Sequence, residues 1–139
     1  MTEEIKRHDF PLPEEDEAML NASSFSWETI TESNYRWVII HDFPVPEQYN
    51  TPKADVAFMI NPNYPSVQID MFYVFPPLSL SGKVINATES KMTICSKSYQ
   101  RWSRHRTDKN PWRPGLDNIY SQIMLVDEML KREVKNESK

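Results

Sequence analysis

Residues 35–41 read Tyr-Arg-Trp-Val-Ile-Ile-His, and this stretch decides the class of fold. Aromatic and β-branched residues of this kind favour β-strands. Because side chains alternate along a strand, positions 35, 37, 39 and 41 share one face and positions 36, 38 and 40 the other. The sequence therefore predicts a strand over 35–41, with His41 packed beside aromatic side chains.

The segments around this stretch predict three further strands. Residues 27–31 precede it across a Glu-Ser-Asn turn at 32–34, and residues 55–60 and 69–74 follow it. Three prolines mark residues 42–52 as a loop, and residues 61–65, Asn-Pro-Asn-Tyr-Pro, predict a turn. Short connections between successive strands indicate an antiparallel meander, which ends at Phe75 and the two prolines that follow it.

Two helices complete the expected fold. Residues 14–20 are acidic and follow Pro11 and Pro13, and carboxylates in a first turn favour a helix. After the Pro-Gly pair at 114–115, apolar residues recur at three- and four-residue steps, which predicts an amphipathic helix of about five turns from Leu116 or Asp117. The apolar positions of this helix are Leu116, Ile119, Tyr120, Ile123, Val126, Leu130 and Val134.

No such period appears over residues 78–110, and irregular segments of this length are usually functional. We therefore expect one α+β domain over residues 1–139, with a polar tail at 134–139. An N-terminal helix and a C-terminal helix cover a four-stranded antiparallel meander. A long irregular segment joins the meander to the second helix.

The composition excludes several classes of protein. Of the 139 residues, 39% are apolar, which provides a core and rules out a wholly disordered chain. No apolar run is long enough to span a membrane, and no secretory signal is apparent. Two glycines leave no Gly-rich phosphate loop, and a single cysteine makes neither an internal disulfide nor a cysteine-based zinc site. The three histidines lack metal-ligand spacing, so we expect no metal. We also expect no cofactor. The single cysteine favours a reducing, cytoplasmic location.

Charge is distributed unevenly along the chain. Residues 1–32 carry nine acidic and two basic residues, whereas residues 97–113 carry six basic residues and one acidic residue. This pattern predicts a charged contact surface. Trp102 and Trp112 beside the arginines make nucleic acid a second candidate partner. The net charge of −4 counts against nucleic acid, and tryptophans beside prolines more often pack under a loop.

Cys95 is the first candidate for chemistry. A lone cysteine is most often a small buried hydrophobe, but Cys95 falls in the irregular segment. Lys97 and Arg101 follow it, and cations favour the thiolate, which is the nucleophilic form. Tyr99 and Trp102 are expected to anchor this segment in a fixed pose. The sequence alone leaves Cys95 open as either a nucleophile or a core residue.

Two other kinds of side chain offer chemistry. His105 is a candidate general base or proton donor, and neighbouring arginines would disfavour its cationic form. The alternative for His105 is a surface histidine that makes a hydrogen bond within the loop. Ser96 and Ser103 are candidate hydroxyl nucleophiles, although neither lies in a G-x-S-x-G elbow.

Several motifs resemble the ubiquitin-conjugating (UBC) superfamily, and most of all its bacterial branch, prokaryotic family E. Residues 99–105, Tyr-Gln-Arg-Trp-Ser-Arg-His, and 112–118, Trp-Arg-Pro-Gly-Leu-Asp-Asn, look like the signature of that branch. The turn at 61–65, followed by Met-Phe-Tyr-Val at 71–74, is similar to the family's P-x-Y-P turn. Ile94-Cys95 with Trp102-Ser103 resembles the family's cysteine and tryptophan-containing turn. The order of elements is that of the UBC fold, and the resemblance covers roughly residues 10–133.

The resemblance implies a carrier reaction. An activating enzyme hands the C-terminus of a ubiquitin-like protein to the thiol of Cys95, and the thioester then passes to an amine of a protein target. Eukaryotic members stabilise the carbonyl oxyanion with an asparagine in a His-Pro-Asn motif, which this chain lacks. Asn86, nine residues before Cys95, and His105 are competing candidates for that role. If the nucleophile were a hydroxyl, Ser103 or Ser96 would carry an oxyester instead.

The resemblance also indicates where partners bind. The activating enzyme of this family docks on the first helix, which here carries Glu14, Glu15 and Glu17, so its docking surface is expected to be basic. Phe75 and Pro76 are candidate contacts for a target or a ligase. A UBC-like module that binds a ubiquitin-like protein without a covalent bond is the alternative function. The resemblance also makes antiphage defence an expected biological role, because of the proteins with which this family occurs.

Overall fold

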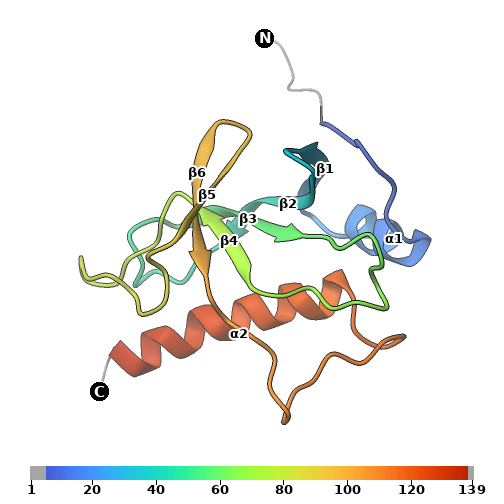
Figure 1. The fold of residues 1–139 in the computed structure, drawn as a ribbon. Helices are drawn as coiled ribbons and strands as arrows, with labels where there is room; N and C mark the ends of the chain where they lie inside the picture. The colour runs from blue at the N-terminus through green and yellow to red at the C-terminus, as the bar shows by residue number, and fades with distance from the viewer. Residues whose placement is uncertain (1–5, 138–139) are drawn as a thin grey trace.

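Two helices and a six-stranded sheet make up most of the computed structural model, which describes residues 6–137 (Figure 1). The helices are α1 (Glu14–Ala22) and α2 (Ile119–Glu137). The strands are β1 (Ser26–Glu32), β2 (Tyr35–Pro44), β3 (Lys53–Met59), β4 (Phe72–Phe75), β5 (Lys91–Ile94) and β6 (Lys97–Trp102). Each strand is antiparallel to its neighbours, in the order β1-β2-β3-β4-β6-β5.

The first four strands follow one another as expected, but the sheet has six strands rather than four. Part of the segment expected to be irregular forms the β5–β6 hairpin, whose two-residue turn is Cys95-Ser96. Both turn residues have positive φ, 51° and 65°, as a tight hairpin turn of this kind requires. Such turns usually contain Asn-Gly or Asp-Gly, so Cys-Ser gave no turn signal in the sequence.

The main core lies between the sheet and α2, which runs along one face of the sheet (Figure 1). Val38 and Ile40 of β2 point into this core, on the strand face predicted for them. From α2 come Ile119, Ile123, Val126 and Leu130. The helix begins at Ile119 rather than near Leu116, because Asn118 caps it: the Ser121 amide donates to Asn118 Oδ1 at 3.0 Å. Two residues expected on its apolar face, Leu116 and Tyr120, are exposed.

A second cluster of buried side chains covers the opposite face of the sheet. It consists of Ile30, Trp37, Ile39, Ala57, Tyr73, Ile94 and Tyr99. The β5–β6 hairpin rises on this side and its tip reaches β1, the strand at the other edge of the sheet (Figure 1). The contact is a hydrogen bond from the Cys95 amide to Glu32 Oε2 at 2.9 Å. The sheet therefore curls around this second cluster.

The N-terminal segment lies along the free edge of β1. The Thr29 amide donates to the Arg7 carbonyl at 3.0 Å, and the Asp9 amide donates to the Thr29 carbonyl at 2.9 Å. His8 pairs with Thr29 in a parallel bridge. Unpaired strand edges are open to further pairing, and this segment covers the edge of β1 next to the hairpin tip.

Candidate functional site

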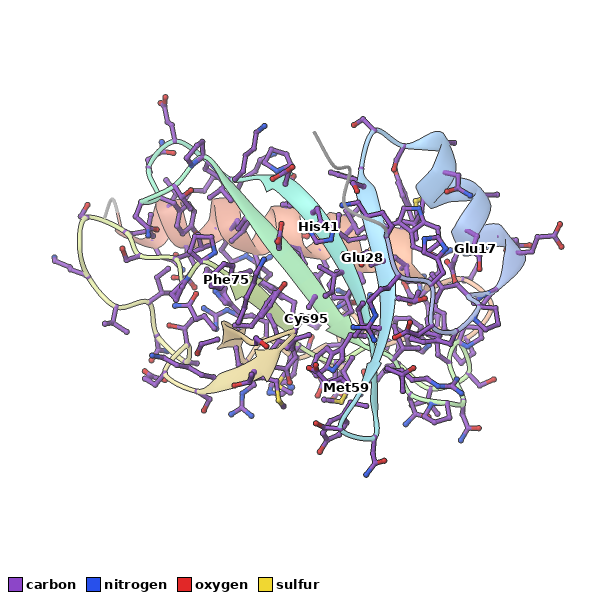
Figure 2. All side chains as sticks on the ribbon, turned by 90° about the horizontal axis from the view of Figure 1, so that it is seen from above. Glu17, Glu28, His41, Met59, Phe75 and Cys95 are labelled. Atoms are coloured by element: carbon purple, nitrogen blue, oxygen red, sulfur yellow. The ribbon has the colours of Figure 1, made fainter. Side chains whose placement is uncertain are left out.

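Cys95 lies at the tip of the β5–β6 hairpin and is half-buried. Figure 2 views the sheet face opposite α2, and Cys95 lies there with Glu28 and His41. The side chain of Cys95 packs at the margin of the second hydrophobic cluster. The only cysteine of the chain therefore combines a partly buried side chain with a place on an exposed turn.

Charged groups of both signs surround the thiol. Burial raises the pKa of Cys95, and the carboxylates of Glu32 and Glu28 raise it further. The cations Arg7 and Lys97 act in the opposite direction, but the net pKa lies above the ordinary value for a thiol. Lys97 acts as the sequence predicted, whereas Arg101 donates to Ser90 Oγ at 3.0 Å. The expectation that neighbouring cations favour the thiolate is therefore wrong for the site as a whole, because its net effect favours the protonated thiol.

Arg7 is the cation in contact with Cys95, and no pattern in the sequence indicated it. Its terminal Nη1 nitrogen lies 4.0 Å from Cys95 Sγ. Its other nitrogens bind the carboxylate of Asp9, with Nε 3.4 Å from Oδ1 and Nη2 2.5 Å from Oδ2. Asp9 Oδ2 also accepts a hydrogen bond from the Thr31 amide at 2.8 Å. Asp9 thus holds the guanidinium beside the sulfur.

A cluster of partly buried charged side chains joins β1, β2 and β3 on the same sheet face. His41 Nε2 lies 2.6 Å from Glu28 Oε1, and His41 Nδ1 lies 3.2 Å from Asp55 Oδ2. The hydrogen bond to Asp55 and then that to Glu28 raise the pKa of His41, against the effect of burial. Burial raises the pKa of both carboxyl groups, but their hydrogen bonds outweigh it and the net pKa of each is lowered. The expected packing of His41 against aromatic residues is thus an ion cluster instead.

The other predicted catalytic residues lie beyond the far end of β6. Cys95 precedes this six-residue strand and Ser103 follows it, so they are separated by about 20 Å at ~3.3 Å per residue. Ser103 lies next to the Asn86 segment, since its amide donates to the Ala87 carbonyl at 3.1 Å. Arg104 donates to the Asn86 carbonyl at the same distance. The structure therefore groups Ser103 with Asn86, and groups neither with Cys95.

His105 is exposed and pairs with an acid of the segment before β4. Its Nδ1 lies 2.9 Å from Asp70 Oδ1, and this contact orients the ring. Nε2 does not contact Asp70. Asp70 borders a groove of about 490 Å³ that Tyr35 and Val67 help to line. No contact connects His105 with Cys95. The catalytic roles expected for His105, Asn86 and Ser103 stay predictions.

The three aromatic residues expected to anchor a loop differ in their surroundings. Tyr99 and Trp102 are fully buried within β6, where Trp102 stacks on Phe72 at 5.2 Å between ring centres. Trp112 is half-buried, and its indole N–H donates to the Pro65 carbonyl at 2.9 Å. The first two therefore hold the hairpin in the sheet, and the third connects the segment before α2 to the turn at 61–65.

The expected partner-binding residues occupy two places. Glu14 and Glu15 are exposed on α1, whereas Glu17 accepts a hydrogen bond from the Leu12 amide at 2.9 Å. Phe75 lies at the hairpin end of β4, with the Lys97 ammonium 5.3 Å from its ring centre, and the next residue, Pro76, is exposed. Within residues 6–137, no helix is long and apolar enough to cross a membrane.

Comparison with known families supplies one further observation. A family model described as prokaryotic E2 family E matches residues 12–133, which is most of the chain. The match includes both helices up to residue 133, all six strands and the segment between β6 and α2. Searches of curated proteins and of solved structures give no match.

Proposed function

Because the chain belongs to prokaryotic E2 family E, we propose that it is a carrier of a ubiquitin-like protein that works through Cys95. An activating enzyme transfers the C-terminus of the ubiquitin-like protein to the thiol, and the resulting thioester is passed to an amine of a protein target. The observation that carries the proposal is the position of the single thiol: it lies on a hairpin turn at the surface, beside a fixed guanidinium.

The position of Cys95 suits a transfer between large partners. A two-residue turn at the tip of a hairpin presents its side chains without a deep cleft, so a folded donor and a folded acceptor can both approach it. The hydrogen bond from the Cys95 amide to Glu32 fixes the turn against β1. A nucleophile that is fixed and yet accessible is what covalent acyl transfer requires.

The raised pKa of the thiol is compatible with a carrier. Burial is its main cause, followed by the charge of Glu32. A thiolate of higher pKa is a poorer leaving group, so its thioester is less reactive toward stray nucleophiles. This arrangement favours a stored thioester, which discharges when an acceptor and the donors around the sulfur act together.

The proposal is tested by mixing the protein with ATP, Mg²⁺, a bacterial ubiquitin-like protein and the activating enzyme of that protein. Intact-mass measurement and a non-reducing gel should show an adduct of wild-type protein that thiol reductant removes. Cys95→Ala should form no adduct, and Cys95→Ser should form one that resists reductant but yields to mild base. Ser98→Ala, a change at an exposed position of β6, is the matched control and should load like wild type.

Two other results would contradict the proposal in different ways. An adduct of wild-type protein that resists reductant and persists in Cys95→Ala would move the nucleophile to a hydroxyl, and loss of that adduct in Ser103→Ala would identify it. The absence of any adduct with an activating enzyme that is demonstrably active would exclude a covalent carrier.

The second candidate function is a module that binds a ubiquitin-like protein without a covalent bond. The separation of Cys95 from Asn86, Ser103 and His105 favours it, because the expected catalytic groups do not converge on the thiol. This candidate requires that Cys95→Ala bind the ubiquitin-like protein and support conjugation in the pathway as wild type does. The carrier proposal requires that conjugation be lost in the same variant.

We further propose that the activating enzyme docks on the exposed acids of α1. Glu14 and Glu15 lie in the first turn of that helix with side chains in solvent. Charge reversal at both positions, Glu14→Lys with Glu15→Lys, should slow loading of the carrier, and added salt should reduce the difference from wild type. Discharge of a thioester that has already formed should not change.

A further inference from the structure

We propose that Arg7 is a catalytic residue of this acyl transfer, donating hydrogen bonds from Nη1 to the carbonyl oxyanion that forms on Cys95. The inference rests on the proposed function and assigns the oxyanion role to a residue outside the segments where the sequence placed it. Nη1 lies 4.0 Å from Sγ, so it borders the position that the carbonyl group of a thioester on this sulfur would occupy.

The guanidinium of Arg7 has donors left for that oxygen. A guanidinium carries five N–H donors in a planar fork. Asp9 engages the edge formed by Nε and Nη2, at 3.4 and 2.5 Å, and Nη1 lies on the side of Cys95. Asp9 is therefore a positioning residue, which fixes the plane of the fork and keeps Nη1 directed at the reacting atoms.

The backbone of Arg7 is also held by hydrogen bonds. Its amide donates to Glu28 Oε2 at 2.9 Å, and its carbonyl accepts the Thr29 amide at 3.0 Å. Cys95, for its part, is tied to Glu32 of the same strand. Strand β1 thus serves as a common frame for donor and nucleophile, and this fixed placement reduces the reorganisation needed in the transition state.

The chemistry of discharge uses this donor twice. The neutral amine of the target attacks the thioester carbonyl carbon, a C–N bond forms, and negative charge collects on the carbonyl oxygen beside Nη1. The C–S bond then breaks and the electron pair leaves with Sγ, which becomes a thiolate facing the same guanidinium. The nitrogen loses its proton to solvent and the thiolate takes one up, so that an amide and the free Cys95 thiol remain.

No other described side chain combines these features. Lys97 is the second cation near the thiol, but its ammonium lies over the Phe75 ring at 5.3 Å and no hydrogen bond fixes it there. Asn86 and His105 lie beyond the opposite end of β6. Arg7 is therefore the donor that the fold brings to the sulfur, although 88 positions separate the two residues in sequence.

The test is single-turnover discharge of preformed thioester to free lysine, followed on non-reducing gels. Arg7→Ala should slow discharge by about tenfold or more, since loss of one oxyanion donor costs up to about 10²–10³ in rate. Arg7→Lys keeps the charge but loses the fork that binds Asp9, and should fall between wild type and Arg7→Ala. Arg132→Ala is the matched control, because Arg132 is exposed on α2 and pairs with Glu128.

A second measurement needs no partner protein. The rate of Cys95 alkylation by iodoacetamide, measured against pH, reports the ionisation of the thiol. Arg7 lowers the thiol pKa, so Arg7→Ala should move the midpoint of the profile to higher pH while Arg132→Ala leaves it in place. Urea unfolding of each variant identifies any rate change that comes from a loss of folding.

The possible failures are distinguishable. If wild type and Arg7→Ala form a thioester and discharge it at the same rate, the inference is wrong while the proposed function stands. An alkylation midpoint that does not move in Arg7→Ala shows that Nη1 does not act on the sulfur, and this also overturns the inference. If wild type forms no thioester with an active activating enzyme, the proposed function fails and the inference fails with it.

Discussion

The backbone amide of Cys95 donates to the carboxylate of Glu32 at 2.9 Å, and this bond joins the two edges of the sheet. Glu32 ends β1 and Cys95 forms the tip of the β5–β6 hairpin, and β1 and β5 are the outermost strands in the sheet order. The bond therefore closes the curl of the sheet over the second hydrophobic cluster. It also places a carboxylate beside the thiol.

Removal of the Glu32 charge should make the thiol more acidic. Glu32→Gln keeps an oxygen that accepts the Cys95 amide but removes the negative charge that raises the pKa of Cys95. The midpoint of the pH profile for iodoacetamide alkylation should therefore move to lower pH. Glu128→Gln, at an exposed position of α2, is the control and should leave the midpoint unchanged. A midpoint that stays in place or rises in Glu32→Gln would contradict this account of the site.

His41 should make the free energy of unfolding depend on pH. Its pKa in the folded protein is raised above the ordinary value of 6.5, first by the hydrogen bond to Asp55 and then by that to Glu28. The imidazolium therefore stabilises the fold fully below the unfolded pKa, and this stability is lost as pH rises through the folded pKa. Each unit of difference corresponds to about 1.4 kcal/mol.

The measurement for His41 is urea unfolding at pH 6 and above pH 8. Wild type should lose stability over this range, and His41→Gln should lose less, because glutamine keeps hydrogen-bonding capacity without a titratable group. Equal losses in the two proteins would show that the Glu28–His41–Asp55 cluster does not make the free energy of unfolding depend on pH.

Tyr64 should stabilise the junction of the two helices with the turn at 61–65. Its hydroxyl donates to Asp16 Oδ2 at 2.7 Å and accepts the Ile119 amide at 2.9 Å. Tyr64→Phe leaves both groups without this partner, and we expect a loss of about 1–3 kcal/mol in the free energy of unfolding. Tyr120→Phe, at an exposed position, should have little effect.

The effect of Tyr64→Phe should itself depend on pH. Burial raises the pKa of Asp16, so the folded state gains stability as pH falls through that raised pKa. Loss of the hydroxyl removes a donor that favours the charged form, and the variant should therefore be penalised more at pH 7 than at pH 4. Thermal unfolding at the two pH values measures this, and an equal penalty at both would count against an ionised Asp16 as the partner of Tyr64.

The turn at the hairpin tip should accept glycine. Ser96 has a φ of 65°, a left-handed conformation that costs side-chain-bearing residues about 1–2 kcal/mol. Ser96→Gly should therefore stabilise the protein by up to about 1 kcal/mol in urea unfolding. Ser98→Gly, within β6, should destabilise it by about 0.5–1 kcal/mol. If both variants are destabilised, the turn does not adopt this conformation in solution.

Local pattern in the sequence predicted the parts of the fold that depend on short-range rules. Strand β2 alternates as expected, with Trp37 and Ile39 on one face and Val38 and Ile40 on the other. The acidic start of α1 and the apolar repeat of α2 were also readable. The hairpin was missed because β5 has four residues and its turn carries Cys-Ser in place of glycine.

The surroundings of the thiol could be predicted only in part. Lys97 is near Cys95 in sequence, and its effect on the thiol was expected. Arg7 and Glu32 lie 88 and 63 positions away, and no local period links such residues. Ser103 and His105 are closer in sequence than either, but an extended strand carries them away from the thiol.

The sequence by itself determined the family, the α+β class and the single thiol, because these depend on residue identity and on periods of two or about 3.6 residues. Only the tertiary structure decided which charges reach that thiol. The curl of the sheet brings the hairpin to the far strand, and Arg7, Glu32 and Cys95 meet there because hydrophobic burial between distant strands closes the sheet.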